Sequence, residues 1–215
     1  MQEKLSKGLF FGLIGNVLFV AFGLICFIYY CTYDVTSILS SILEALAYCT
    51  EFLGFGLLAY SDYLLCSSLR FRRLLKISYS AYILLEAVMM ALELNSYRLE
   101  FYKPYSVVLV ILHTIISGAA CFSFLQLDPD NTRFEVIIVT CIGIALCGMI
   151  AVLLGVRVYF SIIVNAVCFS VLFGSIMFLR SREEIEIDCH GDRANVRNFS
   201  STFFSEKEDE KTDKE

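Results

Sequence analysis

Residues 8–30 have the sequence GLFFGLIGNVLFVAFGLICFIYY, which contains no charged side chain. An α-helix rises about 1.5 Å per residue, so a stretch of this length is sufficient to cross the ~30 Å hydrocarbon core of a bilayer. Lys4 and Lys7 precede the stretch, as they would in a secretory signal peptide. However, the apolar stretch is longer than the core of a signal peptide, and no cleavage site of the A-x-A type follows it. The sequence therefore predicts a retained transmembrane helix.

Five more apolar stretches follow the first one, at residues 38–60, 77–95, 105–127, 134–156 and 158–179. The whole chain is 58% hydrophobic and 18% charged, whereas soluble domains average about 45–50% and about 25%. These features predict an all-α, polytopic transmembrane helical bundle with six spans over residues 1–180. Only residues 155–157 separate the last two stretches, so a count of five spans is the alternative, and it would move the C-terminus to the other side of the membrane.

Lysine and arginine fall mainly on one side of the predicted membrane. That side holds Lys4, Lys7, Arg70, Arg72, Arg73, Lys76, Arg133, Arg180 and Arg182, whereas the other side holds Arg98, Lys103 and Arg157. Because short cytoplasmic loops carry the excess of basic residues in membrane proteins, we expect both termini in the cytoplasm. Residues 181–215 then form an acidic cytoplasmic tail, which accounts for the net charge of −5. The end of this tail is too polar to bury a core, so we expect it to be largely disordered.

Four glutamates lie inside the predicted second and third spans. Glu44 and Glu51 are seven residues apart in one span, and Glu86 and Glu93 are seven apart in the next, so each pair lies along one stripe of its helix. Counting residues from the predicted membrane surfaces places Glu51 and Glu86 near the midplane. Glu44 and Glu93 fall in the outer third, and His113 in the fourth span has a depth between these two levels.

The sequence provides no lysine or arginine deep in any span to neutralise these carboxylates. Four ionised carboxylates are too costly in a medium of low dielectric constant, so some of them must hold protons, accept hydrogen bonds, face water or bind a cation. Tyr48, Tyr82 and His113 are candidate hydrogen-bond donors, and Asn16 and Asn165 are further polar side chains that can join them. We therefore predict a polar cavity between the second, third and fourth spans, with the fifth and sixth spans as lipid-facing support. The alternative is that the glutamates only hydrogen-bond the helices to one another.

Sequence motifs for other chemistry are absent. The nine cysteines include no CxxC pair and no Cys/His cluster, and most of them lie inside apolar stretches, where a thiol behaves as a small hydrophobic group. No phosphate-binding loop, HExxH or GxSxG motif occurs, and His113 is the single histidine of the membrane region. We therefore expect no cofactor, no metal ion, no nucleic-acid partner and no catalytic residue, which favours a protein that is not an enzyme.

Two classes of function remain. The first is a small transporter-like or ligand-sensing protein of the lipid bilayer that binds a proton, a cation or a polar or cationic small molecule through Glu51, Glu86, Glu44, Glu93, His113, Tyr48 and Tyr82. The second is a non-catalytic scaffold or accessory subunit, assembled as a homo-oligomer or hetero-oligomer through its acidic tail and small-residue faces. Those faces comprise Gly8, Gly12 and Gly15 in the first span and Gly143, Cys147 and Gly148 in the fifth. An intramembrane enzyme that uses the carboxylates as acid and base is a weaker third hypothesis.

Overall fold

The computed structural model describes residues 2–32, 37–69, 72–95, 102–128, 131–156 and 158–182. This part of the chain forms α1 (Gln2–Thr32), α2 (Ser37–Ser68), α3 (Arg73–Asn95), α4 (Tyr102–Ser123), a short 3-10 helix η2 (Phe124–Leu127), α5 (Thr132–Leu153) and α6 (Val158–Ser181). All six α-helices are long and apolar enough to cross a membrane, and the described residues contain no strand. The predicted all-α architecture with six long helices is confirmed.

Asn131 and Gly155 form the turns on either side of α5. The Asn131 side chain accepts a hydrogen bond from the Phe134 N–H at 3.2 Å and so caps the start of α5. At the other end, Gly155 has a φ of 102°, a conformation that a residue without Cβ adopts at little cost. This left-handed residue ends α5 and reverses the chain into α6, so the two last apolar stretches form two separate helices rather than the merged one of the five-span alternative.

Helix α2 extends eight residues beyond the predicted end of its apolar stretch. Packing against α1 explains the extension, because the Ser61 hydroxyl donates to the Gly8 carbonyl oxygen at 2.7 Å and Leu65 is buried. Helix α4, in contrast, ends earlier than predicted, and its expected last turn is the 3-10 helix η2.

The glycines of α1 allow it to approach its neighbours closely. A Cβ atom at Gly12 would lie 2.8 Å from Ser61 Oγ and 2.9 Å from Phe173 Cζ, and one at Gly15 would lie 2.9 Å from Leu58. Side chains larger than hydrogen do not fit at these positions. The Gly8, Gly12 and Gly15 face is therefore used inside the molecule, between α1, α2 and α6, and is not available to a partner protein.

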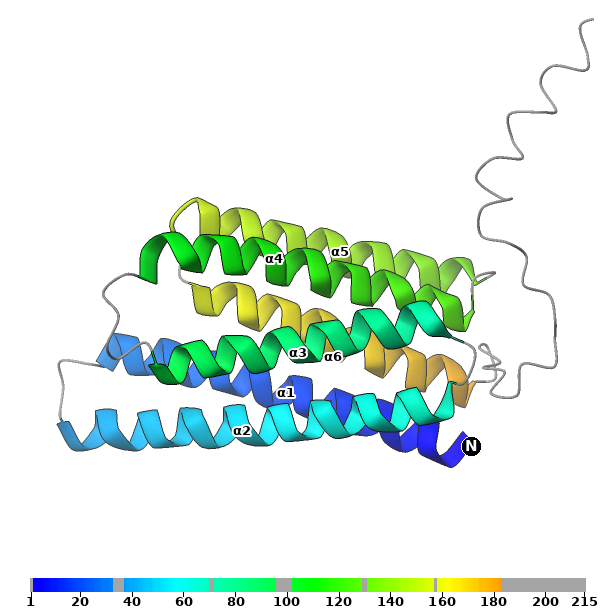
Figure 1. Ribbon diagram of the computed structural model, residues 1–215, viewed down its shortest axis with the longest axis horizontal. Coiled ribbons are helices and arrows are strands. Elements are labelled where there is room, and N and C mark those ends of the chain that lie inside the picture. The colour runs from blue at the N-terminus through cyan, green and yellow to red at the C-terminus, as the bar shows by residue number, and fades with distance from the viewer. Residues whose placement is uncertain are drawn as a thin grey trace, which may run out of the picture.

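Helix α6 lies in the interior of the bundle. Figure 1 shows the six helices side by side along the long axis of the molecule, and α6 contacts α1, α4 and α5. Half of its most apolar segment is buried, compared with 28% for α5 and 22% for α2. The expectation that the sixth span is peripheral support is therefore wrong, and the same expectation for the fifth span agrees with its low burial.

Candidate functional site

Three buried polar side chains connect α3, α4 and α6 near the middle of the bundle. His113 Nε2 on α4 lies 2.6 Å from Glu86 Oε1 on α3, and His113 Nδ1 lies 3.3 Å from Asn165 Nδ2 on α6. The exposed fractions of Glu86, His113 and Asn165 are 6%, 2% and 2%. Both ring nitrogens of the histidine are thus occupied, one by a carboxyl group and one by an amide. We call these three residues the Glu86–His113–Asn165 chain.

Further side chains hold the two ends of this chain in place. At the α6 end, Asn165 Nδ2 donates to the Ser161 carbonyl oxygen at 3.0 Å, and Ser117 Oγ donates to Asn165 Oδ1 at 3.1 Å. At the α3 end, the Tyr82 hydroxyl interacts with the carboxyl group of Glu86. The Tyr82 ring stacks on Phe169 with centroids 4.5 Å apart. The positions of the carboxyl group and the amide are therefore fixed from both sides.

The surrounding hydrogen bonds determine which histidine nitrogen carries the proton. A backbone carbonyl only accepts hydrogen bonds, so the Asn165 atom facing the Ser161 oxygen is the amide nitrogen. The same NH₂ group faces His113 Nδ1, which must therefore be the unprotonated, accepting nitrogen of a neutral ring. The ring proton is then on Nε2 and is donated to Glu86 Oε1.

The same arrangement fixes the amide and the ring relative to each other. A proton on His113 Nδ1 would face the N–H of Asn165, and the amide would have to rotate away from the Ser161 carbonyl to avoid the clash. The orientation of the Asn165 amide and the position of the ring proton are therefore linked.

Buried apolar and aromatic residues enclose the Glu86–His113–Asn165 chain along the bundle. Toward the end where α3 begins, Tyr79 packs against Phe124 and Phe173, with ring centroids 5.7 and 5.9 Å away. Toward the opposite end, Met89 on α3 is buried one turn after Glu86, and Val110 on α4 is buried one turn before His113. Since the members of the chain are themselves more than nine-tenths buried, the chain lies in the packed interior of the described helices.

The structure distributes the other predicted site residues differently. Glu51 is 3% exposed on α2, on the face where Gly54 and Leu58 pack against α1. Glu44 and Tyr48 are half-buried on the same helix. Glu93 lies within α3, but its side chain is outside the part of the chain that the structure describes. We predicted a cavity shared by the second, third and fourth spans, and the described hydrogen bonds of His113 join the third and fourth helices to Asn165 on α6.

Sequence reasoning missed the contributions of Ser117 and Ser161. A signal for them exists, since Ser117 follows His113 by four residues and Ser161 precedes Asn165 by four. Residues four apart share one face of a helix. Pairs of polar residues at this spacing in otherwise apolar helices mark the faces of α4 and α6 that meet.

A second carboxylate lies between α2 and α3 near the end of the bundle. Asp62 accepts hydrogen bonds from the Ser80 hydroxyl at 3.0 and 2.9 Å and from the Cys66 thiol at 3.4 Å. It is half-buried and lines a narrow cavity together with Lys76. Ordinary hydroxyl and thiol donors thus satisfy this carboxylate, close to a cationic side chain.

Cysteines serve packing in the part of the chain that the structure describes. Eight cysteines lie there, and all are free thiols. Cys141 Sγ donates to the Cys168 carbonyl oxygen at 3.5 Å, and Cys168 Sγ donates to the Cys141 carbonyl oxygen at 3.3 Å. This reciprocal pair joins α5 to α6. The described residues contain no group of three or more His, Cys, Asp or Glu side chains arranged to hold a metal ion.

Comparison of the chain with models of known protein families, with curated proteins and with solved structures found no match.

Proposed function

We propose that this chain is a six-span membrane protein, with both termini in the cytoplasm, whose Glu86–His113–Asn165 chain binds and releases a proton in a transporter-like or pH-sensing role. The observation that carries the proposal is the 2.6 Å contact between His113 Nε2 and Glu86 Oε1, between side chains that are 2% and 6% exposed. Ionisable groups inside a membrane are costly and usually mark proton or ion pathways.

The closed geometry favours a proton over the other ligands that the sequence allows. A metal or organic cation needs several oxygen ligands or an open volume around the carboxylate. The carboxyl group of Glu86 instead contacts His113 Nε2 through one oxygen and the Tyr82 hydroxyl. The Tyr82 ring stacks on the buried Phe169 ring. Adding a proton to the second oxygen changes charge without changing volume, so a shift of the helices can follow from protonation alone.

Proton flux through reconstituted vesicles tests the proposal. The full chain is reconstituted in vesicles that contain a pH-sensitive dye, and a potassium diffusion potential drives proton entry. We expect faster acidification than in protein-free vesicles, and we expect Glu86→Gln to reduce the rate to that background. Asp62→Asn is the matched control, because it removes a half-buried carboxylate outside the chain and should leave the rate unchanged.

A wild-type rate equal to that of empty vesicles, together with a Glu86 carboxyl infrared band that does not change between pH 5 and pH 9, would contradict the proposal. The second measurement matters because a proton sensor binds protons without transporting them. A sensor therefore gives no flux but retains the pH-dependent band, and Glu86→Gln removes this band.

Orientation is tested separately with single-cysteine variants and a membrane-impermeant maleimide. Cys31 is exposed at the end of α1 opposite the N-terminus, and Cys189 belongs to the acidic C-terminal segment. With both termini in the cytoplasm, the reagent labels Cys31 in intact cells and labels Cys189 only after the cells are permeabilised. Labelling of Cys189 in intact cells, with Cys31 labelled only after permeabilisation, would show that both termini lie outside the cytoplasm.

An accessory-subunit role is the second candidate, and one observation favours it. On α5, a Cβ atom at Gly143 would meet no atom within 4 Å, and Cys147, one turn later, is exposed. A small-residue face of this kind permits close approach of another helix. If Glu86→Gln has no effect and Gly143→Leu releases a co-purifying membrane protein, this candidate replaces the first one.

A further inference from the structure

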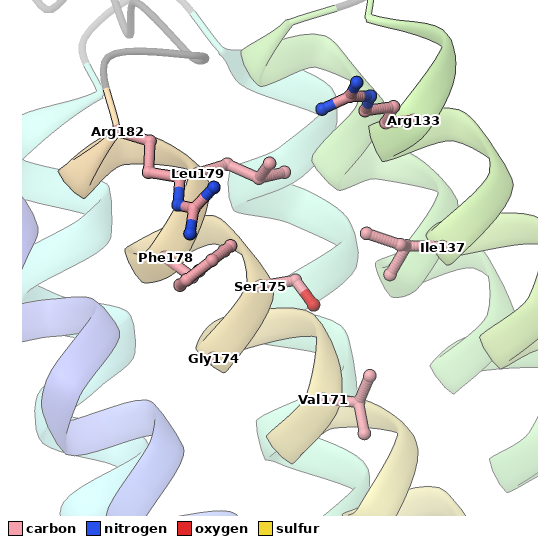
Figure 2. A pocket seen from close by; sticks show the side chains of 8 residues that line it. All are labelled: Arg133, Ile137, Val171, Gly174, Ser175, Phe178, Leu179 and Arg182. Atoms are coloured by element: carbon pink, nitrogen blue, oxygen red, sulfur yellow. The ribbon is translucent and has the colours of Figure 1, made fainter.

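A cavity of about 490 Å³ separates α5 from α6 at the end of the bundle where α5 begins. In Figure 2, Arg133 and Ile137 extend from α5 toward this cavity, and Val171, Ser175 and Arg182 line it from α6. Its volume is within the range of small-molecule binding sites. Both arginines lie at one end of it, and its remaining lining is mainly apolar.

The course of the two helices explains why this cavity exists. Near the hairpin, α5 and α6 pack tightly, since a Cβ atom at Gly148 would lie 3.0 Å from Val164. The reciprocal thiol–carbonyl hydrogen bonds between Cys141 and Cys168 hold the helices together further along. Beyond this point Gly174 leaves space, because a Cβ atom there would meet no atom within 4 Å. Helices α5 and α6 are therefore in contact near the hairpin and separated at the opposite end.

The chemistry of the lining is that of an amphipathic ligand with a negative end. The guanidinium group of Arg182 lies 4.5 Å from the centroid of the Phe178 ring, which holds it at the mouth of the cavity. From Arg182 to Val171 the floor of the cavity follows α6 for about 16 Å. A free anion or an acidic peptide would leave an apolar strip of this length uncovered, whereas an acyl chain covers it. Basic pockets between transmembrane helices are typical sites for anionic lipid headgroups.

We propose that this cavity binds one anionic phospholipid of the leaflet at the basic end of the bundle. Its phosphate lies between Arg133 and Arg182, whose planar guanidinium groups suit phosphate oxygens, and one acyl chain lies over Ile137, Gly174 and Val171. This site rests on the membrane insertion that is part of the proposed function, but it does not depend on the Glu86–His113–Asn165 chain.

Lipid titration of the full chain, followed by native mass spectrometry from a mild detergent, tests the site. The probes are phosphatidylglycerol and phosphatidylcholine with identical acyl chains. We expect the first phosphatidylglycerol to bind about 30-fold more tightly than phosphatidylcholine, as two arginines near an anionic headgroup predict. The double variant Arg133→Gln, Arg182→Gln should bind both lipids equally. Arg73→Gln is the control, since Arg73 is an exposed arginine at the same end of the bundle, on α3.

The acyl-chain part of the site has its own pair of variants. Gly174→Leu fills the cavity and should weaken binding of both lipids at least tenfold. Gly143→Leu, at a glycine of α5 that also faces open space, should leave binding unchanged. If Gly174→Leu retains tight binding that still needs the arginines, a headgroup binds at the surface and the proposed cavity site is wrong.

Three other results would overturn the proposal. A preference for phosphatidylglycerol that survives the double arginine variant would place the lipid elsewhere. Competition by inorganic phosphate at millimolar concentration would identify a free-anion site. Stronger lipid binding after neutralising Glu183, Glu184, Glu186 and Asp188 would identify the chain's own acidic segment as the occupant. Glu86→Gln should leave lipid binding intact, so failure of this site and failure of the proton site are distinguishable.

Discussion

Asp62 and Glu86 are carboxylates on the neighbouring helices α2 and α3, and they are stabilised in different ways. Asp62 is half-buried near one end of the bundle, where the Ser80 hydroxyl donates to both of its oxygens and Lys76 lines the same cavity. Glu86 is 6% exposed in the middle of α3, and its partner is His113, which is held in turn by Asn165.

The difference follows from the distance of each carboxylate from water. Near the end of a helix, solvent and a nearby cation stabilise the charge, so a hydroxyl donor is sufficient. Deep in the bundle, only fixed donors are available, and each unsatisfied group costs about 1–3 kcal/mol or more. A histidine with an oriented second nitrogen gives Glu86 a fixed donor. This difference between the two carboxylates is the one on which the proposed role of Glu86 rests.

Removing the histidine partner should have the largest effect. We expect His113→Leu to lower the free energy of unfolding by about 3–5 kcal/mol, because it leaves Glu86 as a buried charge without its main donor. Denaturant titration in mixed micelles measures this change. The double variant His113→Leu, Glu86→Leu should recover part of the loss, since two apolar groups then pack together. A loss below about 1 kcal/mol for His113→Leu would place Glu86 in the same class as Asp62.

Removing the amide that orients the histidine should have a smaller effect. Asn165→Leu leaves His113 Nδ1 and Ser117 without a partner on α6, so we expect a loss of about 1–3 kcal/mol in the same titration. Ser170→Ala is the control, because Ser170 on the same helix only bonds to its own backbone, at Ala166. Equal losses for the two variants would mean that Asn165 has no special role.

Removing the hydroxyl partner of Asp62 should have the smallest effect on stability. Ser80→Ala removes both hydrogen bonds to Asp62, but the carboxylate is half-buried and keeps the thiol of Cys66. We expect a loss of about 0.5–1.5 kcal/mol, the usual net contribution of one hydrogen bond. A loss as large as that of His113→Leu would remove the contrast between the two carboxylates.

Thiol accessibility compares the two regions without changing their carboxylates. Cys66 is half-buried beside Asp62, whereas Cys121 is 3% exposed and close to Tyr82. In single-cysteine variants, a small maleimide should modify Cys66 at least tenfold faster than Cys121, because modification of a fully buried thiol requires local opening. Similar rates would show that water already reaches the Glu86 region.

The sequence predicts the six helices well because their signals are local. The apolar stretches, the Asn131 cap and the reversal at Gly155 each depend on a few neighbouring residues. The length of α2 was not predictable in this way, because its last turns are stabilised by the contact of Ser61 and Leu65 with α1. Contacts between helices far apart in the sequence are invisible to a hydropathy pattern.

Prediction of the candidate site from the sequence is limited in the same way, because the site depends on contacts between helices. Residue counting places Glu86 and His113 at similar depths, and the structure brings them into contact. Depth alone does not give the rotation of a helix about its axis, so it could not show that an amide of α6 lies next to His113. The sequence identifies Asn165 as a polar side chain that can join the carboxylates, but it does not show that the Ser161 carbonyl, four residues earlier, orients its amide.

The protonation state of His113 tests the central claim most directly. The chain contains two histidines, so ¹⁵N-histidine labelling gives two ring systems in a bilayer sample, and His190→Gln assigns them. At neutral pH, solid-state NMR should find the proton of the His113 ring on Nε2 and none on Nδ1, as the hydrogen bonds to Glu86 and Asn165 require. A ring protonated on Nδ1, or on both nitrogens at neutral pH, would contradict the account.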